Sequence, residues 1–495
     1  MNDKTVTDHD VEIEGLVTVA DLPPEISDVP ELQPLSEVVI PAALKDPVDQ
    51  EEMVHRDFDD SQFWRRIPGF RDVSRDAFMD HRFQGRRSIT SVDELAVALG
   101  DLAPPSFFDD VRAGLARAPM ALRISPYLLG LVDWSEPVSD PIRRQFIPLG
   151  SEQLPDHPML TLDSLHEQAD SPTAGLVHRY PDKVLFLPLD VCPVYCRYCT
   201  RSYAIGADTA LVHKRRFKPR RVAWARAMAY LASRPEVEDV VVSGGDTYLL
   251  PPAMLKEIGE TLLAIPHIRR IRFASKGPAV MPMKILSDRE WTEALIALVE
   301  EGQQMCKEVC LHTHFNCMNE ITEISHEAMD VLFRRGVTVR NQSVLIRGVN
   351  DAPEAMIGLV KQLAYMNVQP YYVYQHDMVR GVEELRTRVK DSMEIERQVR
   401  GTTAGFNTPT FVNDVPGGGG KRDIHSFDYY DEVTGVSVYR SPCVDEDKVY
   451  LYFDPLHLLP EEGRARWAAE APGGIVREAV RMAGLDDHHW ADRLP

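Results

Sequence analysis

Residues 190–200 read Asp-Val-Cys-Pro-Val-Tyr-Cys-Arg-Tyr-Cys-Thr, which places cysteines at positions 192, 196 and 199. The apolar run just before this stretch, residues 183–189, has the length and composition of a buried strand. Three thiolates at C-x3-C-x2-C spacing on one tight loop can hold three irons of a [4Fe–4S] cluster and leave the fourth iron open to a ligand. The alternatives are buried free thiols or a structural zinc site, although zinc requires a fourth ligand and no Cys or His stands at a suitable spacing.

Short apolar runs alternate with amphipathic stretches on the C-terminal side of this loop. Together with residues 183–189, the runs predict strands at residues 237–243, 268–275, 309–315, 337–346 and 368–374. The stretches between them predict helices at residues 221–233, 252–265, 288–305, 325–335 and 352–365. This alternation predicts an α/β fold with a parallel sheet, and six units indicate an open, partial (β/α)6 barrel. In such barrels the chemistry lies at the carboxyl ends of the strands.

The regions outside the barrel differ from it in composition. Residues 1–57 form an acidic arm that we expect to be disordered, because it is rich in proline and has no aromatic side chain. Residues 58–150 predict a helical N-terminal domain, in which Ser91 and Glu94 form a capping box. A polar connector follows at residues 151–175, the barrel occupies residues 176–421, and residues 422–495 form a small C-terminal extension.

The composition of the 495-residue chain bounds its function. The formal net charge of −21 excludes partners that need a basic face, namely nucleic acids and anionic membranes. No stretch approaches the ~18 apolar residues of a membrane span. The N-terminus lacks the layout of a signal peptide, so we expect a cytoplasmic protein. Seven cysteines, an odd number, favour metal or redox chemistry over a disulfide framework.

A second motif, at residues 414–421, reads Asp-Val-Pro-Gly-Gly-Gly-Gly-Lys. A phosphate-binding P-loop would need Gly at 415 and Ser or Thr at 422, where Val415 and Arg422 stand. Four glycines let the backbone approach a bulky ligand closely and deliver one lysine, Lys421. Such a lysine can form a Schiff base with a carbonyl cofactor such as pyridoxal phosphate (PLP). The alternative is a flexible loop that ends in an ordinary lysine.

The cysteine loop after the first strand of a parallel barrel resembles the signature of radical S-adenosylmethionine (SAM) enzymes. This resemblance implies that Cys192, Cys196 and Cys199 bind the cluster and that Tyr198 is the aromatic residue usual before the third cysteine. It also implies that the glycine-rich segment after the second strand receives the amino group of SAM. That segment comprises Ser243, Gly244, Gly245 and Asp246.

Four further cysteines lie outside the triplet. Three of them, together with His312 and His314, could form a second metal site, but packed core thiols are the expectation for Cys306, Cys310 and Cys317. Cys443 is interpreted as incidental.

Several motifs in order resemble the lysine 2,3-aminomutase family. Thr200-Arg201 follows the triplet, His178-Arg179-Tyr180-Pro181-Asp182 precedes it, and the glycine run with Lys421 comes downstream. The resemblance runs from about Ile89 to Lys421. It also includes Asp140-Pro141-Ile142-Arg143, His314-Phe315-Asn316, Asn341-Gln342-Ser343-Val344-Leu345 and Pro370-Tyr371-Tyr372.

The resemblance implies a radical SAM enzyme that also depends on PLP. Lys421 would carry PLP through a Schiff base and would be the catalytic lysine, while His314 would join the SAM site. The residues that match positions around PLP are Arg179, Tyr180, Lys183 and Gln342. Lys183 replaces what is more often Arg, which keeps the charge but loses the planar fork.

The substrate is implied by three charged residues. Arg201 matches the residue that pairs with the α-carboxylate, and Asp377 and Asp414 match the two aspartates that flank the ε-ammonium in lysine-specific members. We expect all of them at one rim, with Asp414 and Lys421 in the loop after the barrel. The implied reaction moves the 2-amino group of L-lysine to C3 and gives β-lysine. The alternative for the two aspartates is a solvated loop position.

Two other functions remain open at this stage. Arginine 2,3-aminomutase is the rival within the class, because a guanidinium can also pair with two carboxylates. A non-catalytic iron–sulfur or PLP-binding protein is the rival from another class. The family resemblance further implies a one-electron reductant such as flavodoxin or ferredoxin, and we expect a homo-oligomer. Because Ala352 follows Asn350-Asp351 where the family has a zinc-binding Cys, no structural zinc is expected.

Overall fold

The computed structural model describes residues 50–215 and 221–485. The predicted disordered arm lies outside these ranges as far as residue 49. Its last part is ordered, because Gln50–Arg56 form a 3-10 helix, and the ring of His55 and the guanidinium of Arg56 lie 6.2 and 5.8 Å from the Tyr365 ring. The sequence predicted that order begins at Phe58, but the ordered chain begins earlier, so the predicted arm is too long at its C-terminal end. The described residues from Met53 onward belong to one compact unit.

A nine-stranded sheet with the strand order β1 to β9 forms the centre of this unit. All six predicted strands are present, and each pairs in parallel with the next. They are β2 (Lys183–Phe186), β3 (Asp239–Val242), β4 (Arg270–Ala274), β5 (Glu308–Thr313), β6 (Thr338–Val344) and β7 (Val368–Tyr374). The predicted α/β partial barrel is therefore confirmed. An antiparallel strand, β1 (Leu176–Tyr180), precedes β2.

The sheet continues beyond the predicted six strands. A seventh parallel strand, β8 (Thr410–Val415), pairs with β7, and β9 (Gly420–Asp423) returns antiparallel to β8. The prediction that Asp414 and Lys421 lie in a loop was therefore wrong, since Asp414 is on β8 and is paired with Lys421 on β9. The polar pair Asn413-Asp414 interrupts the apolar run of β8 and hides the strand in the sequence.

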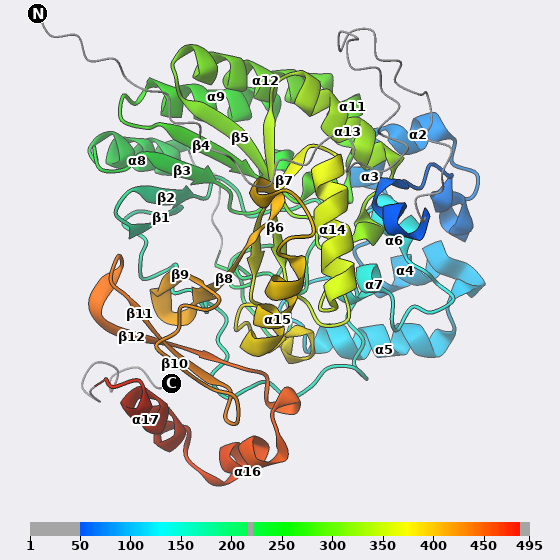
Figure 1. Ribbon diagram of the computed structural model, residues 1–495. Coiled ribbons are helices and arrows are strands. Elements are labelled where there is room, and N and C mark those ends of the chain that lie inside the picture. Colours follow the sequence, from blue (N-terminus) through cyan, green and yellow to red (C-terminus); the bar gives the residue numbers. More distant parts are fainter. Residues whose placement is uncertain (1–49, 216–220, 486–495) are drawn as a thin grey trace, which may run out of the picture. The chain divides into compact units, whose positions relative to one another are not determined.

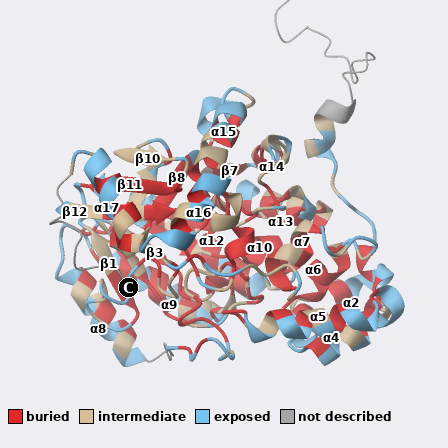
Figure 2. Cartoon of the chain, turned by 90° about the horizontal axis from the view of Figure 1, so that it is seen from below, coloured by how far each residue is buried: buried red, intermediate tan, exposed pale blue. Residues whose placement is uncertain are grey.

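Helices cover the outer face of the barrel (Figure 1). The five predicted helices are confirmed as α8 (Arg221–Ala232), α9 (Pro252–Ala264), α12 (Arg289–Gln304), α13 (Glu323–Arg334) and α14 (Pro353–Tyr365). Shorter helices interrupt or follow them, namely α10 (Gly277–Val280), α11 (Met283–Ser287) and α15 (Val389–Val399). The five longer helices have buried inner faces and exposed outer faces, whereas α10 is buried throughout (Figure 2). Over residues 50–215 and 221–485, no helix is long and apolar enough to cross a membrane.

Six helices lie between Arg75 and Phe146, ahead of the barrel. They are α2 (Arg75–Met79), α3 (His81–Arg86), α4 (Val92–Leu99), α5 (Pro105–Ala116), α6 (Pro126–Leu131) and α7 (Pro141–Phe146). Ser91 caps α4 and accepts a hydrogen bond from the backbone N–H of Glu94, as predicted. Buried aromatic rings hold this region together, with Trp64 stacked on Phe78 at 4.1 Å. No helix or strand spans residues 147–175, which connect α7 to β1.

The C-terminal region supports the loops around the barrel mouth. It contains the antiparallel strands β10 (Tyr429–Asp431), β11 (Val436–Ser441) and β12 (Asp445–Phe453), followed by α16 (Glu461–Ala469) and α17 (Pro472–Met482). A Cβ on Gly419 would lie 2.7 Å from the Tyr450 ring, so β12 packs directly on the glycine run. The Tyr452 hydroxyl donates to the backbone oxygen of His376 at 2.9 Å.

Candidate active site

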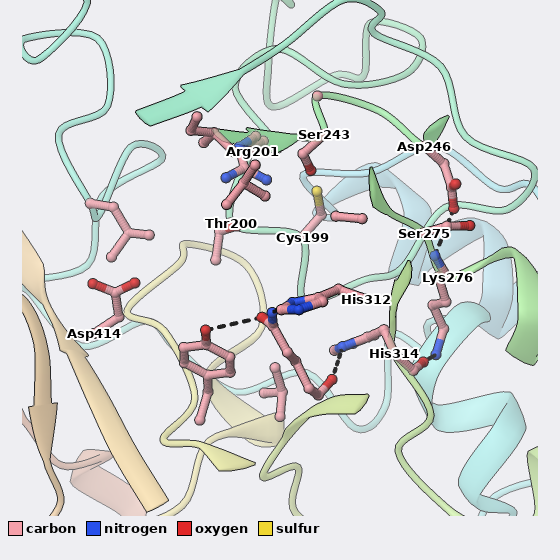
Figure 3. Close-up of a pocket in the computed structure, with 18 of the residues that line it drawn as sticks. Cys199, Thr200, Arg201, Ser243, Asp246, Ser275, Lys276, His312, His314 and Asp414 are labelled. Carbon is pink, nitrogen blue, oxygen red and sulfur yellow. Dashed lines mark hydrogen bonds between the residues drawn. The ribbon is translucent and has the colours of Figure 1, made fainter. Parts of the chain in front are cut away.

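A cavity of about 460 Å³ occupies the barrel interior, and every residue predicted for the site lines it. Side chains reach it because alternate residues of each strand point inward; on β3, Asp239 and Val241 line the cavity whereas Val240 and Val242 are buried on the other face. Figure 3 shows Arg201, Cys199 and Ser243 between Asp414 and Asp246. The predicted residues in the lining are Arg179, Tyr180, Lys183, Cys192, Cys196, Tyr198, Cys199, Arg201, Ser243, Gly244, Gly245, Asp246, His314, Gln342, Asp377, Asp414 and Lys421.

The β7 strand brings more aromatic surface into the cavity than regular alternation would allow. Asn341 on β6 pairs with Pro370, whereas the next residue, Gln342, pairs with Tyr372, so Tyr371 is an extra residue in the strand. As a result both Tyr371 and Tyr372 line the cavity, with ring centroids 3.9 Å apart.

The three cysteines line the cavity from one loop, as the cluster prediction requires. Apolar side chains of Met120, Tyr195 and Ile205 form a small core against Cys192 and Cys199. Burial raises the pKa of all three thiols, that of Cys196 to about 12. Cluster iron would therefore displace protons from these thiols when it binds.

The donor set fits an iron–sulfur cluster rather than a single ion. Among the described residues, no group of three or more His, Cys, Asp or Glu side chains is arranged to hold one metal ion. In a cluster each thiolate binds a different iron, so the three thiolates face one cluster without meeting at a single ion. Of the other cysteines, Cys310 and Cys317 are buried as predicted, but Cys306 is exposed, so its prediction as a core thiol was wrong. Cys306 lies beyond the end of α12, with a positive φ of 54°.

The glycine-rich segment after β3 packs against the cysteine loop. A Cβ on Gly245 would lie 2.1 Å from the carbonyl oxygen of Val191, and Gly244 has φ +94°. Only glycine fits both positions, so this segment packs directly on the backbone that leads into the cysteine loop. Asp246 lines the cavity, but its carboxylate accepts hydrogen bonds from the backbone N–H groups of Tyr248 and Lys276. Asp246 therefore holds the shape of this segment.

Replacing Gly245 with alanine should displace the cysteine loop and reduce iron loading. The added methyl group overlaps Val191 backbone atoms, and overpacking of this kind costs about 1–3 kcal/mol. Iron per chain after anaerobic reconstitution and the melting temperature measure the effect. The matched control is Gly474→Ala in α17, where an added Cβ meets no heavy atom within 4 Å and iron loading should not change. Full iron loading of G245A would contradict the packing argument.

Tyr198 and His314 belong to one hydrogen-bond network beside the cysteine loop. The Tyr198 hydroxyl donates to Gln145 Oε1 at 3.1 Å and lies 3.2 Å from His314 Nε2. His314 Nδ1 contacts the backbone oxygen of Gln342, which can only accept, so Nδ1 carries the proton. Burial lowers the pKa of His314 to about 3, which keeps the ring neutral.

Lys421 projects into the cavity from β9, next to Tyr180 on β1. Its backbone N–H donates to the Tyr180 hydroxyl at 2.7 Å. Gly420, with φ +73°, allows this approach, because a Cβ there would lie 2.6 Å from the same oxygen. The Lys421 Nζ donates to Asp414 Oδ2 at 3.1 Å. Burial opposes the charge, but Asp414 raises the pKa of Lys421 well above its ordinary value.

Cations and hydrogen-bond donors around Lys421 fit a phosphorylated cofactor. Arg179 and Lys183 line the same cavity, and Lys183 lies 4.6 Å from the Tyr180 ring centroid. Gln342 donates through Nε2 to His312 Nδ1 at 2.7 Å, while its Oε1 accepts from the Tyr374 hydroxyl at 3.0 Å. His312 Nε2 is then the protonated nitrogen, and it is buried without a hydrogen-bond partner among residues 50–215 and 221–485. The residues present therefore fit PLP.

The two aspartates of the cavity differ in their surroundings. Asp414 Oδ2 is paired with Lys421, and Arg179 Nη1 lies 3.8 Å from Oδ1, which is buried and accepts no hydrogen bond from the part of the chain that the structure describes. Burial alone would raise the pKa of Asp414, but Lys421 and Arg179 hold it below its ordinary value. The carboxylate of Asp377 forms no hydrogen bond or ion pair within the described residues. Burial, and then Asp414, raise its pKa well above the ordinary value.

Arg201 has a partner that the sequence did not reveal. Its Nε and Nη2 donate to Glu167 Oε2 and Oε1 at 2.9 and 2.7 Å. Glu167 lies in the connector, whose polar composition predicted only a loop. The pair is separated by 34 residues along the chain and follows no spacing pattern, so no sequence signal could have identified it.

Comparisons with known proteins identify relatives of the chain, although no family model matches it. The L-lysine 2,3-aminomutase of Clostridium subterminale is 40% identical over 362 residues, which cover 73% of this chain and 81% of that protein. The L-lysine 2,3-aminomutase of Acetoanaerobium sticklandii is 40% identical over 357 residues, or 72% and 80%. The glutamate 2,3-aminomutase of Clostridioides difficile is 34% identical over 301 residues, or 61% and 67%. The chain therefore belongs to the lysine 2,3-aminomutase family.

Proposed function

We propose that this protein is a radical SAM, PLP-dependent isomerase that moves the 2-amino group of L-lysine to C3 and forms β-lysine. The membership of its family supports an aminomutase. The cavity supports an amino acid with a distal cation, because it offers Arg201 for the α-carboxylate and the carboxylates of Asp377 and Asp414 for that cation.

The residues for the cofactors lie around the same cavity. Cys192, Cys196 and Cys199 would hold the [4Fe–4S] cluster, and the segment 243–246 with His314 and Tyr198 would receive SAM. Lys421 would hold PLP, with Arg179, Tyr180, Lys183 and Gln342 around it. When bound, these groups supply the carbon-centred radical and the electron delocalisation that a 1,2-amino shift requires.

The residues of the chain supply positioning and exclude water. Arg201 and the two aspartates would fix both ends of lysine, so that C3 is held at one place in the cavity. Asp414 would hold the Lys421 proton in the ligand-free cavity, since its Oδ2 lies 3.1 Å from Nζ. Apolar side chains of Met120, Leu165 and Ile205 in the lining would limit the entry of water.

The observation that carries the substrate proposal is that each of the two cavity carboxylates has at least one oxygen without a hydrogen-bond donor among the described residues. Asp377 has no hydrogen bond or ion pair within the described residues, and Asp414 Oδ1 is buried without a hydrogen-bond donor. Asp414 has Lys421 as a hydrogen-bonded counter-ion at Oδ2 but only Arg179, at 3.8 Å, near Oδ1, and Asp377 is half-buried beside the charge of Asp414. Two neighbouring carboxylates, of which only Asp414 forms ion pairs with described residues, favour a ligand that brings a further cation. An anionic side chain such as that of glutamate would be repelled.

Product analysis tests this proposal. The full chain, reconstituted anaerobically with iron, sulfide, PLP and SAM, is reduced and incubated separately with lysine, arginine and glutamate, and the products are chromatographed. We expect β-lysine as the main product. Formation of β-arginine instead would identify arginine as the substrate, and formation of β-glutamate would contradict the two-aspartate argument. If no 5′-deoxyadenosine forms with any of the three amino acids, a non-catalytic binding protein is favoured.

An enzyme with these cofactors requires an electron donor and a reducing environment. A low-potential one-electron donor such as flavodoxin or ferredoxin would reduce the cluster. The described cysteines are all free thiols, which supports a reducing, cytoplasmic location. A homo-oligomer and the absence of a structural zinc site stay predictions.

A further inference from the structure

We propose that Glu167 is a positioning residue for the substrate carboxylate. It holds the guanidinium of Arg201 by one edge and directs the other edge at the α-carboxylate. This inference rests on the proposed function, and it concerns a residue of the connector rather than of the barrel. Residues 161–170, which carry Glu167 across the cavity, are called the strap below.

The contact between Glu167 and Arg201 leaves part of the guanidinium available. Glu167 takes Nε and Nη2 in a two-bond arrangement, with distances of 2.9 and 2.7 Å. Within the residues that the structure describes, Arg201 Nη1 has no hydrogen-bond partner, and Arg201 lines the cavity. A guanidinium has five N–H groups in a fixed plane, so fixing one edge also fixes the direction of the other.

Glu167 is held in place independently of Arg201. Its side chain is 5% exposed, and Oε2 also accepts from the Tyr203 hydroxyl at 3.1 Å. Its backbone N–H donates to Asp163 Oδ1 at 3.0 Å. The Tyr203 contact to the carboxylate and the Asp163 contact to the backbone make Glu167 a fixed support for Arg201, so Glu167 does not have to leave when the substrate arrives.

The strap itself is tied to both ends of the substrate site. Its first residue, Thr161, pairs with the segment just after Asp377. The Thr161 N–H donates to the backbone oxygen of Met378 at 3.3 Å, and the Arg380 N–H donates to the backbone oxygen of Thr161 at 3.2 Å. Its middle accepts the Gly417 N–H at Ser164, at 2.8 Å. The strap therefore relates the position of Arg201 to that of the glycine run and of Asp377.

A second acid of the strap provides a matched control. Asp170 Oδ2 accepts from Arg179 Nε at 2.8 Å, and Arg179 also donates to the backbone oxygen of Leu165. Arg179 belongs to the proposed PLP surroundings and not to the carboxylate site. Loss of the Asp170 carboxylate should therefore weaken PLP retention and leave the recognition of the α-carboxylate unchanged.

The test compares ligands with and without the α-carboxylate. Dissociation constants of lysine and lysinamide are measured on the PLP-loaded full chain from the change in cofactor absorbance, for the wild type, E167Q and D170N. An amide at 167 presents one acceptor and one donor to two N–H groups, so one bond to Arg201 is lost. We expect E167Q to weaken lysine roughly tenfold and to leave lysinamide unchanged. The milder variant Y203F should weaken lysine in the same direction by a smaller factor.

The outcomes separate the positioning role from general damage. An equal loss of affinity for lysine and lysinamide in E167Q would show a merely structural role and overturn the inference, as would an unchanged affinity for lysine. D170N should keep the wild-type ratio of the two affinities while it loses PLP on dilution. A wild-type enzyme that binds lysine but forms no β-lysine would reject the proposed function alone, whereas one that binds no lysine would reject both.

Discussion

Replacement of Lys421 with alanine should abolish the PLP absorbance and turnover while iron loading is retained. Lys421 is the lysine that the glycine run and Tyr180 bring into the cavity, and a methyl side chain cannot form a Schiff base with PLP. The cysteine loop follows β2 and lies far along the chain from β9, which carries Lys421, so the iron content should stay at the wild-type value. Absorbance, iron per chain and β-lysine formation are the three measurements.

The same substitution also removes a counter-ion from Asp414, so its effect on stability has to be separated. In the ligand-free chain Asp414 would keep only Arg179 at 3.8 Å, and a buried group that loses a charged partner costs about 1–3 kcal/mol. Lys421→Arg is the control, because arginine restores a cation beside Asp414 without a nucleophilic amine. We expect K421R to recover the melting temperature but neither the absorbance nor turnover. Turnover by K421R at the wild-type rate would reject the role of Lys421.

Replacement of Asp377 with asparagine should strongly raise the KM for lysine. The iron and PLP content of the protein should change little. Loss of one partner in a buried charge pair costs about 2–5 kcal/mol, which corresponds to at least roughly thirtyfold in affinity. Asparagine keeps the size of the side chain but not its charge. Initial rates with lysine measure the effect, and an unchanged KM would show that Asp377 does not contact the substrate cation.

The raised pKa of Asp377 adds a dependence on pH. Burial and Asp414 favour the protonated form in the empty cavity, and a cation favours the ionised form, so the binding of lysine should release a proton from Asp377. The KM of the wild type should therefore fall as the pH rises through this pKa. Calorimetry in buffers of different ionisation enthalpy measures the release, which D377N should lack.

A rise in pH acts on the stability of the fold in the opposite direction: the ionisation of Asp377 favours the binding of lysine but destabilises the folded chain. Because the pKa is higher in the folded than in the unfolded chain, the folded state binds more protons, and this stabilisation is lost as the pH rises through the folded pKa. Asparagine does not ionise, so D377N does not lose this stability at high pH. D377N should consequently melt at a higher temperature than the wild type at alkaline pH, which also shows that its higher KM does not come from unfolding.

The parts of the fold that could be predicted are those with a local signal. The strands β2 to β7 are apolar runs between amphipathic helices, and the cysteine and glycine motifs are contiguous in the sequence. Strand β8 was missed because Asn413 and Asp414 interrupt its apolar run. The bulge at Tyr371 was missed because it appears only when β6 and β7 are paired.

The parts of the site that could not be predicted are contacts between distant segments. The family resemblance identified Arg201, but its partner Glu167 lies in a connector without periodicity. His312 was considered only as a ligand of a second metal site, whereas its Nε2, which has no hydrogen-bond partner among the described residues, points to a role in the cavity. Such roles depend on which side chains the strands bring together, and one sequence does not contain that information.

The packing of β12 against the glycine run sets a limit on the smallest fragment that can work. A chain that ends after Asp423 would keep every strand of the barrel and every residue proposed to bind cofactor or substrate. It would nevertheless lose Tyr450, which packs on Gly419, and Tyr452, which donates to the backbone of His376. The barrel is thus not an autonomous catalytic module, and transplantation of this site into another scaffold has to include the hairpin as far as Phe453.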